Sequence, residues 1–393
     1  MGLWGVTLGP MLQGAAKTWG VALLVAVACS GSLDPVSSPT TASDGMRAAE
    51  PASSSPTPDR CFGDSAPEQI ATDPRPRDLF ANEKEVLWRS GQLLHRMDAS
   101  GRTSTLDVGA LYFIDAVDSR EVFGSDHQLN LLAIDLSSGK LRPVSPSSAW
   151  SNRVSGLITL FGANYVLDSD YVYVGWRGDP AVNGFLSSGG ERLRSLKGPH
   201  DAGLLSRVRR DGSSAPELFG KGPDTPFVVS DGYAYWGSRW EGLKRRALVP
   251  GASSEMVWTA PDVPLTWPIG ISGGRLYFRM LADMASSPRM FTIASVPAQP
   301  ASADGGAAPP PRVHVPPSPQ PFNDAILLGH CVYSGGPGGV VRADLDDGSV
   351  KTLIEGRPVP GDGTLLFTRL LASDGRSLYW ADYGGDRVVR WTR

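Results

Sequence analysis

The sequence lacks most of the features from which a function is usually assigned. No apolar run approaches the roughly 20 residues that a membrane-spanning helix needs, and helix signals are scarce. No His-Glu-x-x-His, phosphate-loop or Cys-x-x-Cys pattern occurs. With a net charge of −3 and no basic cluster interleaved with aromatic residues, the chain offers no electrostatic case for nucleic acid. The sequence therefore predicts no nucleic-acid partner, no cofactor and no catalytic residue that a motif reveals.

The arrangement of histidines also gives no sign of a metal centre. The five are scattered, with no two at metal-ligand spacing: His95, His127, His200, His314 and His330. His95 alternates with apolar neighbours, which favours a strand-surface residue over a ligand. His330 precedes Cys331, and we interpret it as a strand side chain. We predict no metal site.

One acidic run has a superficial likeness to a calcium loop. Asp344, Asp346 and Asp347 supply carboxylates at close spacing, but Gly348 follows at once and no downstream glutamate completes the pattern. Glycine after aspartates is common in tight turns. We interpret this run as a hairpin turn.

What the sequence does contain is a repeat. Seven segments share a hydrophobic pair and a strand-like run that in most copies ends at a glycine: 93–101, 131–139, 204–212, 243–251, 290–298, 340–348 and 388–393. Most follow an aromatic strand, at 86–88, 111–113, 171–174, 233–236, 276–278, 332–333 and 378–380. A period of about 45 residues built of short strands is typical of propeller blades. The sequence predicts an all-β fold, a seven-bladed β-propeller of four-stranded antiparallel blades.

The fourth unit shows how one repeat forms a blade. Strand-like runs at 227–229, 233–236, 243–248 and 255–258 are separated by turns rich in glycine, serine and aspartate, which is the pattern of successive hairpins. The second unit is less regular, because almost nothing separates Val108 from the aromatic run taken as its second strand. If the first two units share one blade, the ring has six blades.

The last copy stops after its third strand, so the final blade lacks its outer edge. An open edge strand invites aggregation, and circular closure removes it. The run 68–72 lies upstream of the first complete unit and is otherwise unassigned. We predict that it pairs with the edge of the blade that contains Tyr379 and Trp380.

The residues of the seventh copy carry a resemblance to a known family. The run Leu-Tyr-Trp-Ala-Asp at 378–382 resembles the Tyr-Trp-Thr-Asp repeat of the propellers first named in lipoprotein receptors, with Ala381 in place of threonine. The runs 235–238 and 112–115 are shorter copies. The resemblance extends over about residues 67–393 and is shared with many exported bacterial propellers. It implies that these residues pack blade against blade, and it implies fold more than function.

The N-terminus is typical of an exported protein. The apolar run 21–28 has the length of a signal-peptide core, with Lys17 as its positive flank. Ala-Val-Ala-Cys at 26–29 resembles the bacterial lipobox, which implies a signal peptide at 1–28 and lipidation, including palmitate, at Cys29. The lipobox prefers leucine where Ala26 stands, and an ordinary secretory signal is the alternative. Ser30 resembles the sorting pattern of outer-membrane lipoproteins.

Residues 29–62 follow as a segment of serine, threonine, proline and alanine with little to bury, which predicts a disordered tether. The propeller domain would then occupy 63–393. Two cysteines remain, Cys61 and Cys331, and in an exported chain they are candidates for one disulfide. The alternative is two unpaired thiols.

Two long insertions, 177–203 and 298–321, are candidate functional loops, because loops at blade ends often carry function. A propeller can also assemble a site in its central channel from several blades. Bacterial lactonases and streptogramin-lyase-like enzymes do so, and asparagines keep this option open here: Asn130, Asn164, Asn183 and Asn323.

The sequence as a whole favours a monomeric cell-envelope lipoprotein that is not an enzyme. We expect it to be anchored in a membrane by lipid, in the outer membrane and facing the periplasm or the surface, with a propeller that binds an envelope protein, a glycan or a small ligand. The alternative is a hydrolase or lyase with a metal-assisted site in the central channel. Convergent carboxylate, histidine or asparagine side chains would favour the enzyme, and an aromatic rim would favour a binding partner.

Overall fold

The structure is a computed structural model that describes residues 61–128, 130–146, 164–176, 203–223, 226–238, 241–263, 265–283, 290–300, 309–318, 324–336, 338–356 and 369–392. The chain divides into two compact units, Met1–Ser55 and Pro56–Arg393, and every described residue belongs to the second. The predicted signal peptide, Cys29 and nearly all of the tether lie outside the described residues. Within them, no helix is long and apolar enough to cross a membrane.

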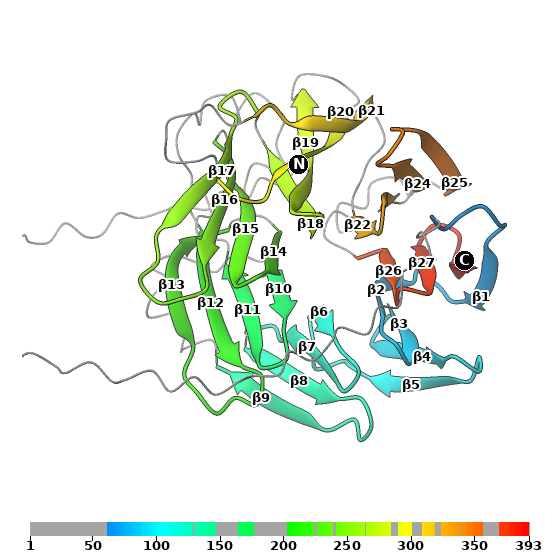
Figure 1. Ribbon diagram of the computed structural model, residues 1–393. Coiled ribbons are helices and arrows are strands. Elements are labelled where there is room, and N and C mark those ends of the chain that lie inside the picture. Colours follow the sequence, from blue (N-terminus) through cyan, green and yellow to red (C-terminus); the bar gives the residue numbers. More distant parts are fainter. Residues whose placement is uncertain are drawn as a thin grey trace, which may run out of the picture. The chain divides into compact units, whose positions relative to one another are not determined.

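The described strands form seven four-stranded antiparallel sheets, the blades of a β-propeller (Figure 1). The strands of blades 1 to 3 are, from the inside outward, β2 (Arg77–Ala81), β3 (Glu85–Ser90), β4 (Leu93–Asp98) and β5 (Thr103–Asp107); β6 (Phe113–Val117), β7 (Glu121–Ser125), β8 (Leu131–Asp135) and β9 (Leu141–Ser145); and β10 (Asn164–Leu167), β11 (Tyr171–Trp176), β12 (Gly203–Arg209) and β13 (Glu217–Gly222).

Blades 4 to 7 repeat this arrangement. Their strands are, in the same order, β14 (Phe227–Ser230), β15 (Tyr233–Ser238), β16 (Gly242–Ala247) and β17 (Ser254–Thr259); β18 (Thr266–Ser272), β19 (Arg275–Asp283), β20 (Met290–Pro297) and β21 (Arg312–Ser318); β22 (Asp324–Leu328), β23 (Cys331–Gly336), β24 (Gly339–Asp344) and β25 (Val350–Glu355); and β26 (Leu371–Ser373), β27 (Ser377–Asp382), β28 (Arg387–Thr392) and β1 (Glu68–Thr72).

The seven innermost strands contact one another in a closed series, β2, β6, β10, β14, β18, β22, β26 and again β2. Because each blade starts anew with its inner strand, these strands run in the same direction. Their first residues lie at one face of the ring, which we call the start face. The hairpins that join each inner strand to the second strand lie at the opposite face, which we call the turn face.

The seven repeats seen in the sequence are the third strands of the seven blades. Each copy overlaps one of the strands β4, β8, β12, β16, β20, β24 and β28. The aromatic runs form second strands in every blade but the second. The prediction of seven blades is therefore confirmed, and the six-bladed alternative is wrong.

The second blade corrects our assignment of its strands. Residues 111–113 do not form its second strand: Leu111 is buried in the connection between blades, and Phe113 begins the inner strand β6. The second strand is β7, whose only ring-bearing residue is Phe123. The connection is a tight turn, in which the Leu111 N–H donates to the carbonyl of Val108 at 2.8 Å. A buried turn therefore looked like a strand in the sequence.

The proline-rich insertion 298–321 also contains more structure than the sequence indicated. Its run Arg312–Ser318 is β21, the outer strand of blade 5, and it pairs with β20. Of the other insertion, 177–203, only Gly203 lies within the described residues.

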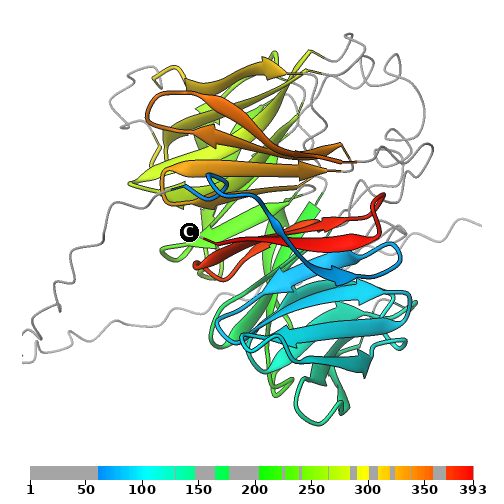
Figure 2. The ribbon, with the colours of Figure 1, turned by 90° about the vertical axis from the view of Figure 1, so that its right-hand side faces the viewer.

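The predicted closure of the ring is confirmed. β1 pairs antiparallel with β28, with Glu68 opposite Arg390 and Thr72 opposite Arg387. Figure 2 shows β1, in blue, beside the red strands of the C-terminus. Arg390 and Glu68 also form an ion pair at 2.6 Å. The first strand of the domain thus completes its last blade.

The segment just before β1 is fixed to blade 6. Phe62 is buried, its N–H donates to the Tyr333 hydroxyl at 2.5 Å, and Arg342 donates to its carbonyl at 2.9 Å. Asp64 forms an ion pair with Arg342 at 3.0 Å, which lowers the pKa of that carboxyl. We call residues 61–64 the strap. The strap connects blade 6 to the strand that closes blade 7.

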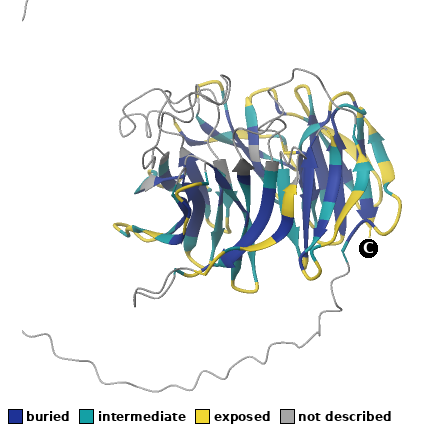
Figure 3. Ribbon diagram, turned by 90° about the horizontal axis from the view of Figure 1, so that it is seen from above, coloured by how far each residue is buried: buried dark blue, intermediate teal, exposed yellow. Residues whose placement is uncertain are grey.

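The core lies between the blades (Figure 3). In the seventh blade Trp380 and Ala381 are fully buried, and Asp382 is buried as well. The Asp382 carboxylate accepts hydrogen bonds from the Gly385 N–H at 3.0 Å and from Arg387 Nε at 2.9 Å. These residues pack and close a turn, which agrees with the structural role that the repeat implies.

Candidate functional site

A backbone irregularity marks the start of the innermost strand of blade 1. β2 pairs regularly with β3 at Phe80 and Ala81, but Asp78 and Leu79 bulge out of the ladder. Asp78 has a φ of 48°, in the left-handed region that residues with a side chain rarely occupy. Strained backbone of this kind collects at binding and catalytic sites.

The carboxylate of Asp78 lies among arginines. It is 4.0 Å from Arg77 Nε and 3.8 Å from Arg89 Nη1, and no described residue donates a hydrogen bond to it. Burial raises the pKa of the Asp78 carboxyl, and the attraction of three arginines, Arg369 among them, only partly offsets this effect. Three cations around one anion leave a local excess of positive charge in a chain whose net charge is −3.

Arg89 ties this carboxylate to blade 2. Its buried guanidinium donates to the carbonyls of Gly91, Leu111 and Tyr112 at 2.9 to 3.0 Å. The same Nη1 that bonds Tyr112 also faces Asp78. Arg89 is therefore a positioning residue, since its own donors are already used.

Arg369 reaches the same place from blade 7. Its carbonyl accepts from the Leu79 N–H of the bulge at 2.9 Å, and its guanidinium lies over the Phe80 ring, 4.9 Å from the centroid. The next residue, Leu370, donates its N–H to the Asp324 carboxylate of blade 6 at 3.0 Å. Blades 6 and 1 thus hold the exposed residue Arg369 from both sides.

A group of aromatic side chains begins at Tyr112, whose backbone carbonyl accepts from Arg89. Tyr112, at the start of the inner strand of blade 2, is 44% exposed. Its ring lies 4.5 Å from that of Phe113 and 4.4 Å from that of His127, in the loop after β7. All three lie at the start face. We call Arg77, Asp78, Arg89, Tyr112, Phe113, His127 and Arg369 the rim cluster.

Sequence reasoning missed most of this cluster. It named Tyr112 only as part of a repeat and His127 only as an unpaired histidine. The signal available was weak: Arg-Asp at 77–78 and Arg369 stand at or just before the start of inner strands, so they belong at one face of a ring. A bulge and a positive φ at an aspartate cannot be recognised from a single sequence.

Two of the four asparagines proposed for the channel are among the described residues, and they lie in different blades. Asn130 lies in the loop before β8 and donates to Asp126 at 2.8 Å. Asn164 begins the inner strand β10, whereas Asn183 and Asn323 lie outside the described residues. The channel site therefore stays an expectation of the sequence.

The histidines take varied positions. His95 lies on β4, stacked on Trp88 at 5.5 Å, with Nε2 3.3 Å from an Asp73 oxygen, so the prediction of a strand residue is correct. His330 lies in the turn before β23, which corrects its assignment to a strand, and it pairs with Asp346 at 3.5 Å. His200 lies outside the described residues.

The acidic run at the end of β24 is the predicted hairpin turn. The Asp346 N–H donates to Asp344 Oδ1 at 2.9 Å, and the Ser349 N–H donates to Asp347 Oδ1 at 2.7 Å. Gly348 has a φ of 73°, as such a turn requires. The carboxylates bind backbone amides of their own turn.

Cys61 and Cys331 lie together, as the disulfide prediction requires. Their Cα atoms are 6.0 Å apart, within the range that a disulfide spans, and their sulfurs are bonded in this structure. With Asp344 they form the only group among the described residues with three metal-ligating side chains within 4.8 Å. A disulfide leaves no thiolate for a metal. The bridge itself stays a prediction that peptide mapping tests.

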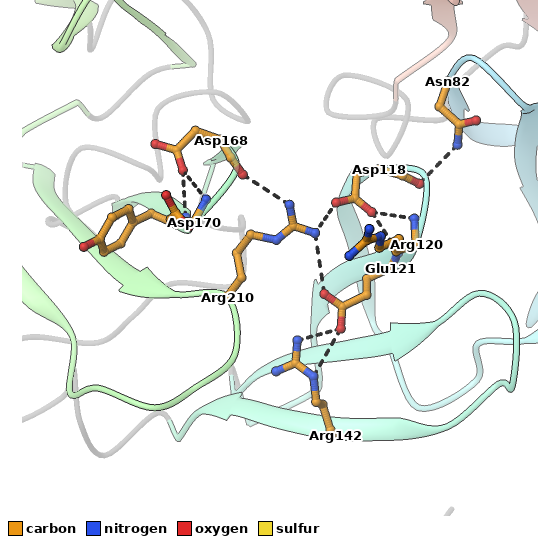
Figure 4. A network of polar contacts seen from close by, with 9 residues as sticks. Asn82, Asp118, Arg120, Glu121, Arg142, Asp168, Asp170 and Arg210 are labelled. Atoms are coloured by element: carbon orange, nitrogen blue, oxygen red, sulfur yellow. Dashed lines mark hydrogen bonds and ion pairs between the residues drawn. The ribbon is translucent and has the colours of Figure 1, made fainter.

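A second polar network, at the turn face, has a structural explanation (Figure 4). Arg210 pairs with the carboxylates of Asp118 and Glu121, and donates to the Asp168 carbonyl at 3.2 Å. Asp118 and Asp168 also accept two N–H groups each from the turns that they begin. Arg142 is a second partner of Glu121, at 2.6 Å. The network ties the hairpins of blades 2 and 3 together.

A serine in the spacing of a hydrolase elbow occurs once, at 270–274 (Gly-Ile-Ser-Gly-Gly). Ser272 ends the inner strand β18 and is followed by the two-residue turn into β19. A nucleophile elbow joins a strand to a helix, so this match does not indicate a serine hydrolase.

No protein-family model matches the sequence, and a comparison with curated proteins finds no relative. Solved structures are similar in fold. An oligogalacturonate lyase in complex with manganese and an oligogalacturonate lyase from Vibrio parahaemolyticus superpose with TM-scores of 0.53 and 0.52. Each alignment has 10% identity and covers 82% of this chain and 92% of the other. At this identity the likeness shows the fold alone, and the ligand must be argued from the residues.

Proposed function

We propose that this protein is a lipid-anchored protein of the bacterial cell envelope whose propeller binds a ligand at the rim cluster. The observation that carries the proposal is the conjunction at one face of an exposed aromatic ring, two accessible arginines and a strained, largely enclosed carboxylate. A strained backbone and a buried charge each lower the stability of the protein. The fold does not require them, because a residue without strain or charge could occupy the same position. Binding sites commonly use a few convergent polar groups beside aromatic surface.

The envelope location rests on the sequence of the N-terminus. The lipobox-like 26–29 and the polar segment that follows are those of an anchored and tethered protein. The position of the strap indicates where the tether joins the propeller. Cys61 lies against Cys331, which directly follows the hairpin turn of blade 6 and so belongs to the turn face. The rim cluster lies at the opposite face, so the tether joins the propeller away from the proposed binding site.

The experiment is a binding screen of the purified propeller, residues 59–393, against envelope glycans and envelope proteins. The Tyr112→Ala and Arg77→Gln variants should each bind on the order of tenfold more weakly than the wild type. Arg376→Gln is the matched control, because Arg376 is an exposed arginine at the turn-face end of the same blade as Arg369. Binding that all three variants retain equally would place the ligand elsewhere and contradict the proposal.

The second candidate function is a propeller lyase or hydrolase acting at the same cluster. Two observations favour it: the structural neighbours named above are lyases, and Asp78 is a carboxyl whose raised pKa suits general acid or base catalysis. A lyase would introduce a carbon–carbon double bond into a polyuronate, which ultraviolet absorbance detects. Turnover that Asp78→Asn abolishes, with binding retained, would decide for the enzyme. Its metal-assisted form needs ligands, and the one three-ligand group among the described residues lies at the strap.

A further inference from the structure

We infer that the rim cluster takes an anionic saccharide, and that Asp78 is an internal counter-ion which the ligand's acid group replaces. The inference rests on the proposed function and names the ligand class for that site. It follows from the way in which the charges and rings of the cluster are arranged.

The first step is the availability of the arginines. The Arg77 side chain is 37% exposed, and Arg369 is exposed. Among the described residues neither guanidinium donates a hydrogen bond, and Arg77 has only the 4.0 Å contact with Asp78. A guanidinium presents up to five donors in a fixed fork that matches a carboxylate. Two such groups at one face leave many donors for an acidic ligand.

The second step is the poor fit of Asp78 to the place that it occupies. One oxygen, Oδ2, lies at ion-pair distance from both Arg77 and Arg89, beyond the roughly 2.7 to 3.2 Å of a hydrogen bond. The residue also bears a left-handed φ of 48°. Asp78 therefore neutralises part of the arginine charge without forming the bidentate contacts that a free carboxylate could form. A ligand that forms them gains more than Asp78 loses.

The third step is the aromatic surface. Saccharides pack their apolar ring faces on exposed aromatic side chains, and the 44% exposed Tyr112 is braced by the rings of Phe113 and His127. Arg89 holds the backbone of Tyr112 and faces Asp78 with one nitrogen. Arg89 thus links the backbone at Tyr112 to the carboxylate of Asp78. The inference places the sugar ring on Tyr112 and its carboxylate substituent at the position of Asp78, beside the arginine pair. A neutral sugar would gain the stacking alone.

A matched pair of probes tests the inference: cellotetraose and its counterpart oxidised to a carboxylate at every C6. Titration calorimetry of the wild-type propeller at low salt should show an affinity for the acidic tetramer at least about tenfold above that for the neutral one. We expect a difference of this size from one additional ion pair between ligand and protein. Arg77→Gln and Arg369→Gln should each remove roughly this preference. Asp78→Asn should raise affinity for the acidic tetramer and leave that for the neutral one unchanged.

The outcomes separate the two levels of the argument. Equal affinity for the two tetramers, with loss of both in Tyr112→Ala, would overturn the acidic ligand class and leave a saccharide site. Binding of neither tetramer, together with capture of an acidic envelope protein that Arg77→Gln abolishes, would overturn the saccharide inference and keep the rim cluster as a binding site. Binding of either tetramer that no rim variant changes would overturn both. Arg376→Gln and unchanged circular dichroism spectra serve as controls for charge and folding.

Discussion

Among single residues, Asp78 shows most clearly the tension between stability and a binding role. An aspartate at a φ of 48° carries backbone strain that glycine would not, and burial disfavours the charge of its carboxylate, which has no described hydrogen bond. A residue that served only the fold would be better replaced here by glycine.

We therefore expect Asp78→Gly to stabilise the propeller, by on the order of 1 kcal/mol, because glycine relieves the left-handed strain and no charge remains to be desolvated. Chemical denaturation of the two proteins measures the difference. The reverse exchange, Gly375→Asp, should destabilise, since Gly375 has a φ of 83° in an exposed turn. A less stable Asp78→Gly protein would show that Asp78 supports the fold.

His314 is the second residue whose environment sets a measurable property. It is buried in blade 5, with Nε2 2.9 Å from the Ser295 hydroxyl and its ring 5.4 Å from that of Tyr277. Burial, and then the charge of Arg312, lower the pKa of His314 below the ordinary 6.5. The folded state therefore holds the neutral imidazole, whereas the unfolded chain binds a proton more readily.

Stability should consequently be fully present above pH 6.5 and fall as the pH drops through the lowered pKa of His314. His314→Gln keeps a hydrogen-bonding group but cannot titrate, so its stability should change less between about pH 7.5 and 5.5. At the higher pH the free energy of unfolding of the variant should itself be about 1 kcal/mol lower than that of the wild type, because glutamine fills the site of the imidazole less well. Urea denaturation at the two pH values measures both effects, and parallel slopes for the two proteins would rule out His314 as the titrating group.

Among the elements, β1 and the strap are the ones that close the ring. β1 supplies the fourth strand of blade 7 from the far end of the sequence, and the strap binds blade 6 through backbone atoms of Phe62 and through Asp64. Gly63 has a φ of 94°, and a Cβ there would overlap the side chain of Leu353. The strap is therefore built to lie flat on blade 6.

A chain that begins at about residue 76 should melt well below one that begins at about residue 59. The first lacks the strap and β1, so the edge of β28 is open, whereas the second lacks only tether. Thermal melts of the two truncations provide the measurement, and light scattering should show that only the shorter chain associates. Equal melting temperatures would mean that closure by β1 adds no stability.

The disulfide prediction belongs to the same element. A Cys61–Cys331 bridge closes a loop with a sequence separation of 270, and the chain-entropy model assigns such a bridge a few kcal/mol. Non-reducing peptide mapping of the exported protein should recover the two cysteines in one linked peptide. Cys61→Ser should lower the free energy of unfolding by that amount under oxidising conditions only, because Cys61 is half-buried and serine is accommodated there. Free thiols at both positions in the exported protein would disprove the bridge.

The sequence was sufficient for the elements that repeat and insufficient for those that do not. Third strands were recognisable because each blade places a hydrophobic pair and a turn glycine at the same positions, and closure followed from a missing strand at the C-terminus. The second blade failed because Val108 and Leu111 are buried in a turn, which a hydrophobic pattern cannot separate from a strand. The rim cluster could not be predicted from the sequence, because positions 77, 112 and 369 are far apart in the chain and become neighbours only when the ring of blades closes.

For the whole molecule, the proposed arrangement is an anchor, a tether that joins the propeller at the strap, and a propeller with its binding site at the start face. The sequence predicts a tether of about thirty residues, and a disordered segment of that length would span on the order of 30 Å, enough to hold a domain clear of a membrane surface. The strap then receives the tether at the turn face, beside Cys331. The proposed binding site lies at the opposite face of the propeller.

Replacing Cys29 with serine should release the protein from membranes into the soluble fraction, because stable attachment requires the acyl chains that only the cysteine sulfur and the new N-terminus can carry. Fractionation of cells expressing the two forms tests this, and Cys61→Ser is the matched control, since it removes a cysteine without touching the lipobox. The control should stay with the membrane. Mass spectrometry of the wild-type N-terminus measures the modification directly. A mature chain that begins with an unmodified residue other than Cys29 would contradict the lipoprotein prediction. The protein would then be a secreted propeller without a lipid anchor.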